Sequence, residues 1–123
     1  MGKAAPDATI DAMFDYVDLS NIMHVCSGEP ANYAGIAAVS LASVAMTPNT
    51  DFTKANGTVS GRKVTVAAKS GVSVASSGTA THLVLALTSD STLRYVTTCT
   101  SQALTAGNTV NIPAWEIEVQ DPT

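Results

Sequence analysis

The sequence predicts a mainly β fold, an antiparallel β-sandwich or a flattened barrel, with one short helix near the N-terminus. Three observations support this prediction: helical periodicity is confined to the first 18 residues, short apolar runs fill the rest of the chain, and turn-forming residues separate those runs. A length of 123 residues fits one hydrophobic core. We therefore expect a single β-rich domain over residues 1–123, with the β-sandwich over residues 21–120.

The predicted helix covers residues 8–18. Apolar residues recur there at intervals of three and four and so share one face, while aspartates occupy the opposite side; the apolar set is Ile10, Met13, Phe14 and Val17. Pro6 and Asp7 suit the first turn, because proline tolerates the missing N–H and a carboxylate is favoured by the helix dipole. Residues 1–7 are expected to form an extended N-terminal arm.

After the helix, short apolar runs alternate with turn residues. The run from Ile22 to Cys26 predicts a buried strand, and the segment 34–46 suits a helix by its alanines or a strand by its valines. We favour a loop that leads into a strand over about residues 40–46. Later turns are expected at Asn56-Gly57 (as a type I′ hairpin), Ser70-Gly71, Ser77-Gly78, Asp90-Ser91 and Gly107-Asn108.

The last predicted strand changes facing in its middle. Val110 and Ile112 keep one parity, whereas Trp115 and the apolar residues after it keep the other. Since one extra residue reverses the facing of all that follows, and since proline cannot donate to a ladder, we predict a bulge at Pro113-Ala114. Glu116 and Glu118 are then expected to point to solvent or to a partner.

The charge pattern excludes several classes of partner. The net charge is −4, and Arg62 and Lys63 are the only adjacent basic residues, so a nucleic-acid partner is not expected. No stretch approaches the roughly 18 apolar residues that span a bilayer, and neither a signal peptide nor a membrane anchor is predicted. Charged residues make up only 13% of the chain, a scarcity typical of a surface that faces neighbouring subunits.

The histidines and cysteines are the side chains most suited to form a chemical site. His24 and Cys26 lie two residues apart and therefore on one strand face, with His82 and Cys99 as further candidate ligands of a zinc ion. Zinc sites usually combine two close pairs of ligands, whereas here the second pair is split. A disulfide between Cys26 and Cys99 is the other alternative, which folding in a cytoplasm disfavours. The sequence leaves both open.

No catalytic motif is present. The chain has neither a Gly-x-Ser-x-Gly elbow nor a glycine-rich phosphate loop, and Cys26 lies in an apolar run that would raise its pKa rather than activate it. We therefore predict that the protein is not an enzyme, and we assign no catalytic residue, no cofactor and no metal ligand.

Five segments of the sequence resemble small virion structural proteins of tailed bacteriophages. They are residues 5–11, the run from Val25 to Pro30, the run from Ser60 to Ala67, the run from Tyr95 to Val110, and Pro113-Ala114-Trp115. The resemblance covers most of the chain. It implies a β-rich subunit that is present in many copies, binds a capsid or tail lattice, and works by contact.

On this basis we expect a capsid decoration, or cement, protein that stabilises the head lattice of a virion assembled in the host cytoplasm. Its partners would be the major capsid protein or other virion proteins, together with copies of itself. The alternatives are a tail or connector component and a carbohydrate-binding module. The residues that we expect at an interface are Lys3, Pro6, Trp115, Glu116 and Glu118, with the chain ends 1–7 and 119–123 ordering on the capsid.

Overall fold

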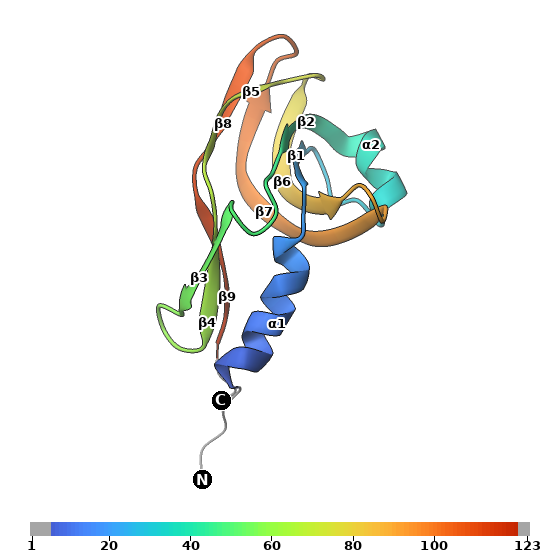
Figure 1. Ribbon diagram of the computed structural model, residues 1–123. Helices are drawn as coiled ribbons and strands as arrows, with labels where there is room; N and C mark the ends of the chain where they lie inside the picture. Colours follow the sequence, from blue (N-terminus) through green and yellow to red (C-terminus); the bar gives the residue numbers. More distant parts are fainter. Residues whose placement is uncertain (1–5, 121–123) are drawn as a thin grey trace.

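The computed structural model describes residues 6–120 and confirms a mainly β protein with antiparallel sheets (Figure 1). Strands make up 51% of it and helices 17%. The elements in chain order are α1 (Asp7–Asp18), β1 (Ile22–Cys26), the 3-10 turn η1 (Tyr33–Gly35), α2 (Ile36–Val39), β2 (Ser40–Ala45), β3 (Phe52–Asn56), β4 (Arg62–Val66), β5 (Lys69–Ser73), β6 (Gly78–Leu87), β7 (Thr92–Leu104), β8 (Thr109–Ile112) and β9 (Trp115–Val119).

The strands form three antiparallel sheets in two layers. One layer is the four-stranded sheet with the order β2-β1-β6-β7. The other consists of the pair β5-β8 and, beyond one end of that pair, the sheet β3-β4-β9 (Figure 1). Apolar side chains from both layers and from α1 meet in one core cluster, so the layers enclose a common interior.

The second layer is a long ribbon that is interrupted at its middle. Val66 pairs with Trp115 on one side of the interruption and Lys69 with Ile112 on the other, so neither strand gains a residue there. The predicted bulge at Pro113-Ala114 is therefore wrong. Because Pro113 has no N–H to donate, the ladder breaks instead. The expected change of facing is present along β8 and β9, since Val110 and Ile112 are buried before the break and Ile117 is buried after it.

The bulge lies in the opposite strand, at the position where a turn was predicted. The register of β5 on β8 shifts between Lys69 and Val72, which gives β5 one extra residue. Gly71 takes a φ of 66° there, and its N–H donates to Oδ1 of Asn111 at 2.9 Å. The prediction of a turn at Ser70-Gly71 is therefore wrong. Glycine at positive φ occurs in bulges as well as in turns, so the residue types alone do not distinguish the two structures.

The hairpin between β3 and β4 also differs from the predicted type I′ turn at Asn56-Gly57. Five residues, 57–61, connect the two strands, and the glycine with positive φ is Gly61, at 69°. A Cβ on Gly61 would lie 2.0 Å from the carbonyl oxygen of Val119. A Cβ on Gly57 would lie equally close, at 2.0 Å, to the carbonyl oxygen of Ser60, so close backbone approaches require glycine at both ends of the loop, and only Gly61 has a positive φ.

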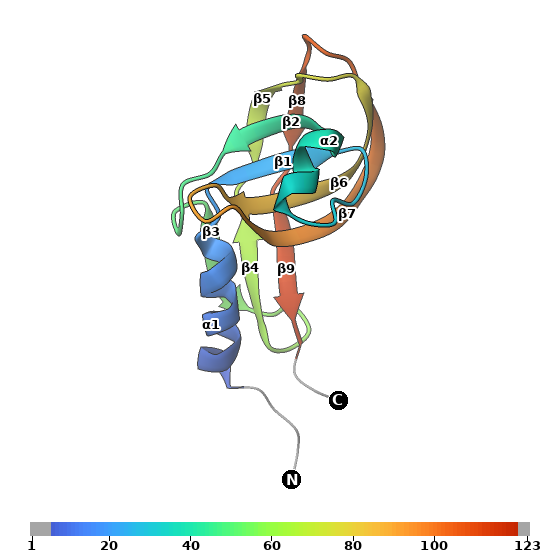
Figure 2. The ribbon, with the colours of Figure 1, turned by 90° about the vertical axis from the view of Figure 1, so that its right-hand side faces the viewer.

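Helix α1 confirms the predicted helix within one residue, because Asp7 is already helical and Pro6 is the N-cap. Its buried apolar residues are Ile10, Phe14 and Val17, which join the core cluster, whereas Met13, which was predicted on the same face, is exposed. Figure 2 shows α1 running alongside β3, β4 and β9, below the four-stranded sheet. The helix thus covers the part of the second layer that the four-stranded sheet does not reach.

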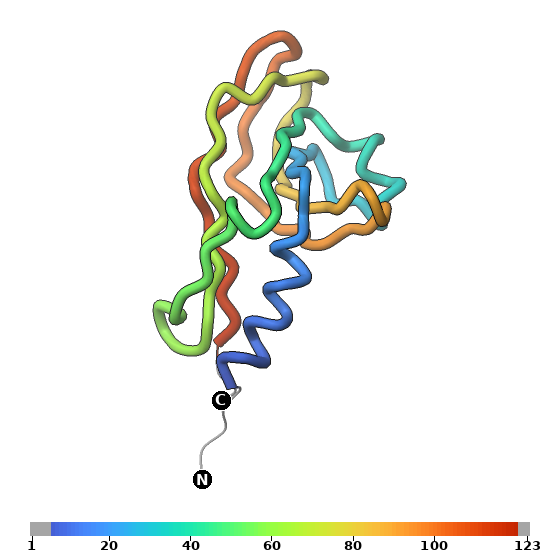
Figure 3. Tube along the Cα trace, in the orientation of Figure 1, coloured from blue at the N-terminus to red at the C-terminus, as the bar shows by residue number. Residues whose placement is uncertain are grey.

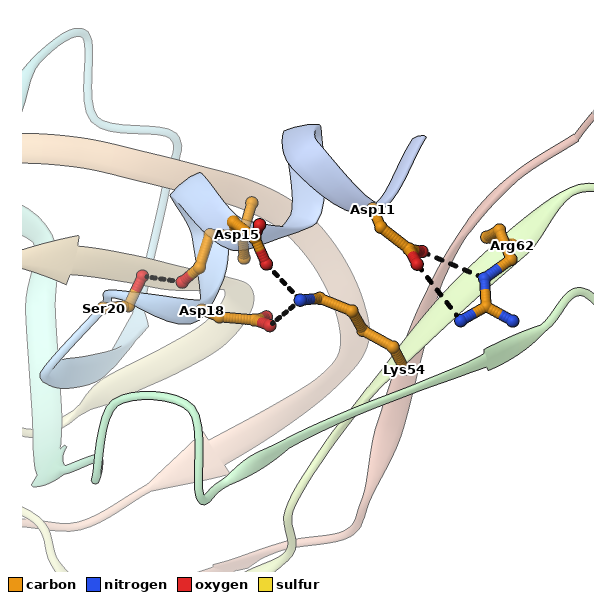
Figure 4. A network of polar contacts seen from close by, with 7 residues as sticks. Asp11, Asp15, Asp18, Ser20, Lys54 and Arg62 are labelled. Carbon is orange, nitrogen blue, oxygen red and sulfur yellow. Dashed lines mark hydrogen bonds and ion pairs between the residues drawn. The ribbon is translucent and has the colours of Figure 1, made fainter. Parts of the chain in front are cut away.

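Polar contacts hold the other flank of α1 on β3 and β4 (Figure 4). Lys54 lies between Asp15 and Asp18 and pairs with both, at 3.4 Å from Oδ2 of Asp18. Arg62 donates from Nε to Oδ1 of Asp11 at 2.9 Å and from Nη2 to Oδ2 at 3.3 Å. Burial raises the pKa of the Asp18 carboxyl against the opposing effect of Lys54.

The segment 34–46 combines both alternatives left by its sequence. The predicted strand is confirmed as β2, but the expected loop ahead of it contains η1 and α2. Ile36 of α2 is buried in a small second cluster with Cys26, Val84 and Ala86. This explains why β6 is buried on both faces in its second half, since α2 covers the side that faces away from the main core.

The two layers are joined along one side. The carbonyl oxygen of Leu41 on β2 accepts from the N–H groups of Ala75 and Ser76 at 2.8 and 3.1 Å, and Ala42 bridges to Val74 just after β5. On the opposite side β7 continues through residues 105–108 into β8, but β7 pairs only with β6 and β8 only with β5 among the described residues (Figure 3). The molecule is therefore a flattened barrel that is closed between β2 and β5 and open between β7 and β8.

Candidate functional site

The open side of the barrel forms a groove, which we call the seam. Its two walls are residues 97–102 of β7 and residues 110–116 of β8, β9 and their connection, and its volume is 440 Å³. The floor consists of apolar core side chains. The residues that line it are Val25, Ala80, Leu83, Thr97, Thr98, Cys99, Thr100, Gln102, Leu104, Val110, Asn111, Ile112, Pro113, Trp115 and Glu116.

Both walls of the seam are strand edges without a strand partner in the range 6–120. Such edges carry unpaired N–H and C=O groups, which are a template for another strand. Natural proteins usually protect them with charged side chains or proline. The β8–β9 wall has Pro113 and Glu116, whereas β7 carries no charge between residues 95 and 104. With respect to charge and proline, the β7 edge is therefore the less protected of the two.

Trp115, predicted as an interface anchor, lies at one end of the seam. Its ring stacks on that of Tyr95 from β7, with the centroids 6.0 Å apart and the planes at 28°. Its indole Nε1 is buried and has no hydrogen-bond partner among the described residues. An unpaired buried donor costs about 1–3 kcal/mol. The Tyr95–Trp115 pair thus bridges the two layers where no backbone ladder does, and it leaves one donor unsatisfied.

Glu116 and Glu118 contact their own chain more than predicted. Glu116 is exposed at the rim of the seam but pairs with Lys63 at 2.8 Å, and this contact lowers its pKa. Glu118 accepts from the N–H groups of Thr58 and Val59 at 2.8 and 3.3 Å, which lowers its pKa as well. Glu118 therefore stabilises the loop between β3 and β4, and of the two carboxylates Glu116 is the one that lines the seam.

The remaining predicted interface residues lie elsewhere. Pro6 is exposed at the start of α1, and Lys3 and the chain ends 1–5 and 121–123 lie outside the described residues. Val119, expected in a C-terminal segment that orders on the capsid, is instead paired with Arg62 within the sheet. Trp115 and Glu116 are thus the two predicted interface residues that the structure brings together.

The candidate zinc ligands are distributed over two clusters. Cys26 on β1 is paired with His82 on the neighbouring strand β6, and Cys26 packs in the small cluster under α2. Cys99 packs against the main core instead. His24 contacts the hydroxyl of Ser40 at 2.9 Å, and His82 contacts that of Thr81 at 2.8 Å. No three His, Cys, Asp or Glu side chains of residues 6–120 are grouped so as to hold a metal ion.

Both cysteines are free thiols with different surroundings. Cys26 is fully buried, and burial raises its pKa to about 11. Cys99 is half-buried in the wall of the seam, and its pKa is also raised by burial. The sequence had left a Cys26–Cys99 disulfide open, but the structure keeps the two thiols unpaired and in different clusters.

The seam itself was not predicted from the sequence. One signal points to it, because no charged residue occurs between Tyr95 and Trp115, a stretch that provides most of both walls. A second feature that was missed is the apolar flank of α1, where Met13 and Tyr16 are 56% and 51% exposed. The guanidinium of Arg94 lies 3.7 Å from the centre of the Tyr16 ring and fixes that ring on the surface.

Comparison of the chain with protein-family models, with curated proteins and with solved structures found no match. In the part of the chain that the structure describes, neither helix has the length and apolar character needed to cross a bilayer.

Proposed function

We propose that this protein is a structural subunit of a tailed-bacteriophage virion, and more specifically a capsid decoration protein that stabilises the head lattice through protein–protein contacts. The proposal starts from the resemblance of five sequence segments to such proteins. It assigns no catalytic step, because a subunit of this kind acts by burying surface between neighbours.

The observation that best supports this proposal is the seam. Two strand edges that have no strand partner among residues 6–120 border a groove with an apolar floor and one charged lining residue, Glu116. Trp115, whose indole N–H has no hydrogen-bond partner in the same range, lies at one end. Unpaired edges and an aromatic anchor are features of surfaces that bind other protein chains. The low content of charged residues, 13%, agrees with a surface that is covered in an assembly.

Electron microscopy of the phage that encodes the chain tests the proposal. Gold-labelled antibody against the protein should mark the heads, and deletion of the gene should give heads that release DNA at a lower temperature than those of the parent. Purified protein added back to such heads should restore their stability. Label on the tails would support the tail or connector alternative instead, and label on no part of the particle would contradict a virion role.

A further inference from the structure

We propose that the seam binds an extended segment of a different protein subunit, which adds as a strand beside β7 and carries small, uncharged side chains. The inference deepens the proposed function and rests on it for the identity of the partner as a lattice subunit. The mode of binding rests on the seam alone. Three features of the groove determine the occupant: its edges, its charge and its size.

The edges favour a peptide over a compact ligand. Residues 97–102 of β7 pair with β6, and residues 110–116 pair with β5 and β4, but on the side that faces the seam neither wall has a strand partner among residues 6–120. The N–H and C=O groups on these two edges can therefore pair with an added main chain. An added strand gains its affinity from such main-chain bonds. The wall residues have mostly short polar side chains, which leave the β7 edge accessible; these residues include Thr97, Thr98, Thr100 and Gln102.

The charge of the seam favours an uncharged occupant. Among residues 6–120, Glu116 is the only charged residue that lines the seam, and Lys63 forms an ion pair with its carboxylate at 2.8 Å. A charged side chain brought into the groove would therefore lose water without finding an opposite charge, which is costly. The occupant that matches this lining is a segment of uncharged residues.

The size of the seam favours small side chains. Residues 97–102 of β7 face only the four residues 80–83 of β6, so they span about 13 Å at the rise of a strand. Divided along that length, a volume of 440 Å³ leaves about 110 Å³ for each residue of an added strand. This is room for a peptide unit with a side chain such as that of alanine, serine or threonine.

The shape of β7 argues against edge-to-edge pairing with a second copy. Ala80 pairs with Gln102 and His82 with Thr98, so β7 has two residues more than β6 in this interval. The strand is strongly curved there (Figure 1). A bulged edge resists pairing with the edge of another folded sheet. A separate extended segment can follow the curve.

Cys99 provides a reporter for occupation of the seam. It is a free, half-buried thiol in the wall, whereas Cys26 is fully buried and serves as an internal control in the same molecule. The rate at which N-ethylmaleimide modifies Cys99, followed by mass spectrometry, should fall at least threefold when the isolated protein is saturated with the peptide acetyl-Ala-Thr-Ala-Thr-Ala-Thr-amide. The same peptide with glutamate in place of its second threonine should leave the rate unchanged.

Two variants locate the effect. Thr98→Lys places a charge on an exposed position of the seam and should abolish protection, and Thr100→Lys replaces it if Thr98→Lys does not fold. Thr53→Lys makes the same change on exposed β3, away from the seam, and should be protected like the parent protein. Circular dichroism checks that each variant is folded.

Three results would overturn the inference. The first is a Cys99 rate that no peptide concentration changes, and the second is equal protection by the neutral and the glutamate peptides. The third is a rate that falls with protein concentration in the absence of peptide, which would identify a second copy as the occupant. Because these measurements use the isolated protein, they can fail while microscopy still finds the protein on heads, and the reverse outcome is equally distinguishable.

Discussion

Replacing Phe14 by alanine tests whether α1 belongs to the folded core. Phe14 is 2% exposed and lies between Ile10 and Val17 on the buried face of the helix. Truncation of a buried phenylalanine costs about 3–5 kcal/mol, from the lost burial and the cavity that remains. A domain of this length has a total stability of about 5–15 kcal/mol. The variant should therefore lose a large part of the free energy of unfolding and melt roughly 12–20 °C lower.

Urea unfolding followed by circular dichroism and by Trp115 fluorescence measures this loss. Met13→Ala is the matched control, because Met13 is on the same helix but 56% exposed, and its replacement should change the free energy of unfolding by less than about 0.5 kcal/mol. If Phe14→Ala does not fold, Phe14→Leu should still fold with a loss of about 1–2 kcal/mol. A loss below about 1 kcal/mol for Phe14→Ala, or equal losses for Phe14→Ala and Met13→Ala, would refute the docking of α1 by this face.

Two further predictions concern single positions. Burial raises the pKa of Asp18 in the folded state, so its ionised form destabilises the fold above that pKa, and this penalty disappears as the pH falls towards the ordinary value of 3.8. Melting curves at pH 7 and at pH 4 should therefore show a smaller gain at pH 4, or a larger loss, in Asp18→Asn than in the parent, and an identical pH dependence would contradict this. Gly61→Ala should lower the free energy of unfolding in urea by at least about 2 kcal/mol, because the position combines a positive φ with a clash against Val119. Gly71→Ala has a positive φ in open space and should lower it by only about 1 kcal/mol. Equal losses in the two variants would show that the clash is relieved.

The sequence predicted those elements whose pattern is set within the element itself. The helix was predicted within one residue because the spacing of Ile10, Phe14 and Val17 is sufficient to define its buried face. The buried strand predicted from Ile22 to Cys26 is confirmed as β1, and its short apolar run is a pattern of the same local kind. These patterns require no knowledge of what packs against them.

Three of the errors have a common cause, since each depended on a partner strand. Gly71 lies in a bulge and Asn56-Gly57 does not form a tight turn, and in both cases the residue types suit either structure. The register of the opposite strand decides between them. Pro113 likewise breaks a ladder without adding a residue, which becomes visible only when the pairs on both sides of the break are known.

The seam was hidden from the sequence for a related reason. Consecutive strands usually pair, and the short connection 105–108 between β7 and β8 predicts a hairpin. In the fold β8 pairs with β5 instead. The next strand, β9, pairs with β4, which precedes β5, so the two consecutive pairs hold β8 beside β5. The strands of the expected hairpin are therefore separated, and the uncharged stretch between Tyr95 and Trp115 becomes the two walls of a groove.

This separation also accounts for the absence of charge along the stretch. An edge strand that stays in water is usually protected by lysine or by inward-pointing charges. The β7 wall has threonines and a glutamine instead, which are compatible with strand pairing and cost little to desolvate when their hydrogen bonds are replaced. Such an edge is a liability in a free monomer but suits a subunit whose edge is covered on assembly. A Thr98→Lys variant that is soluble, folded and fully incorporated into heads would separate these two requirements and would contradict the seam as the contact.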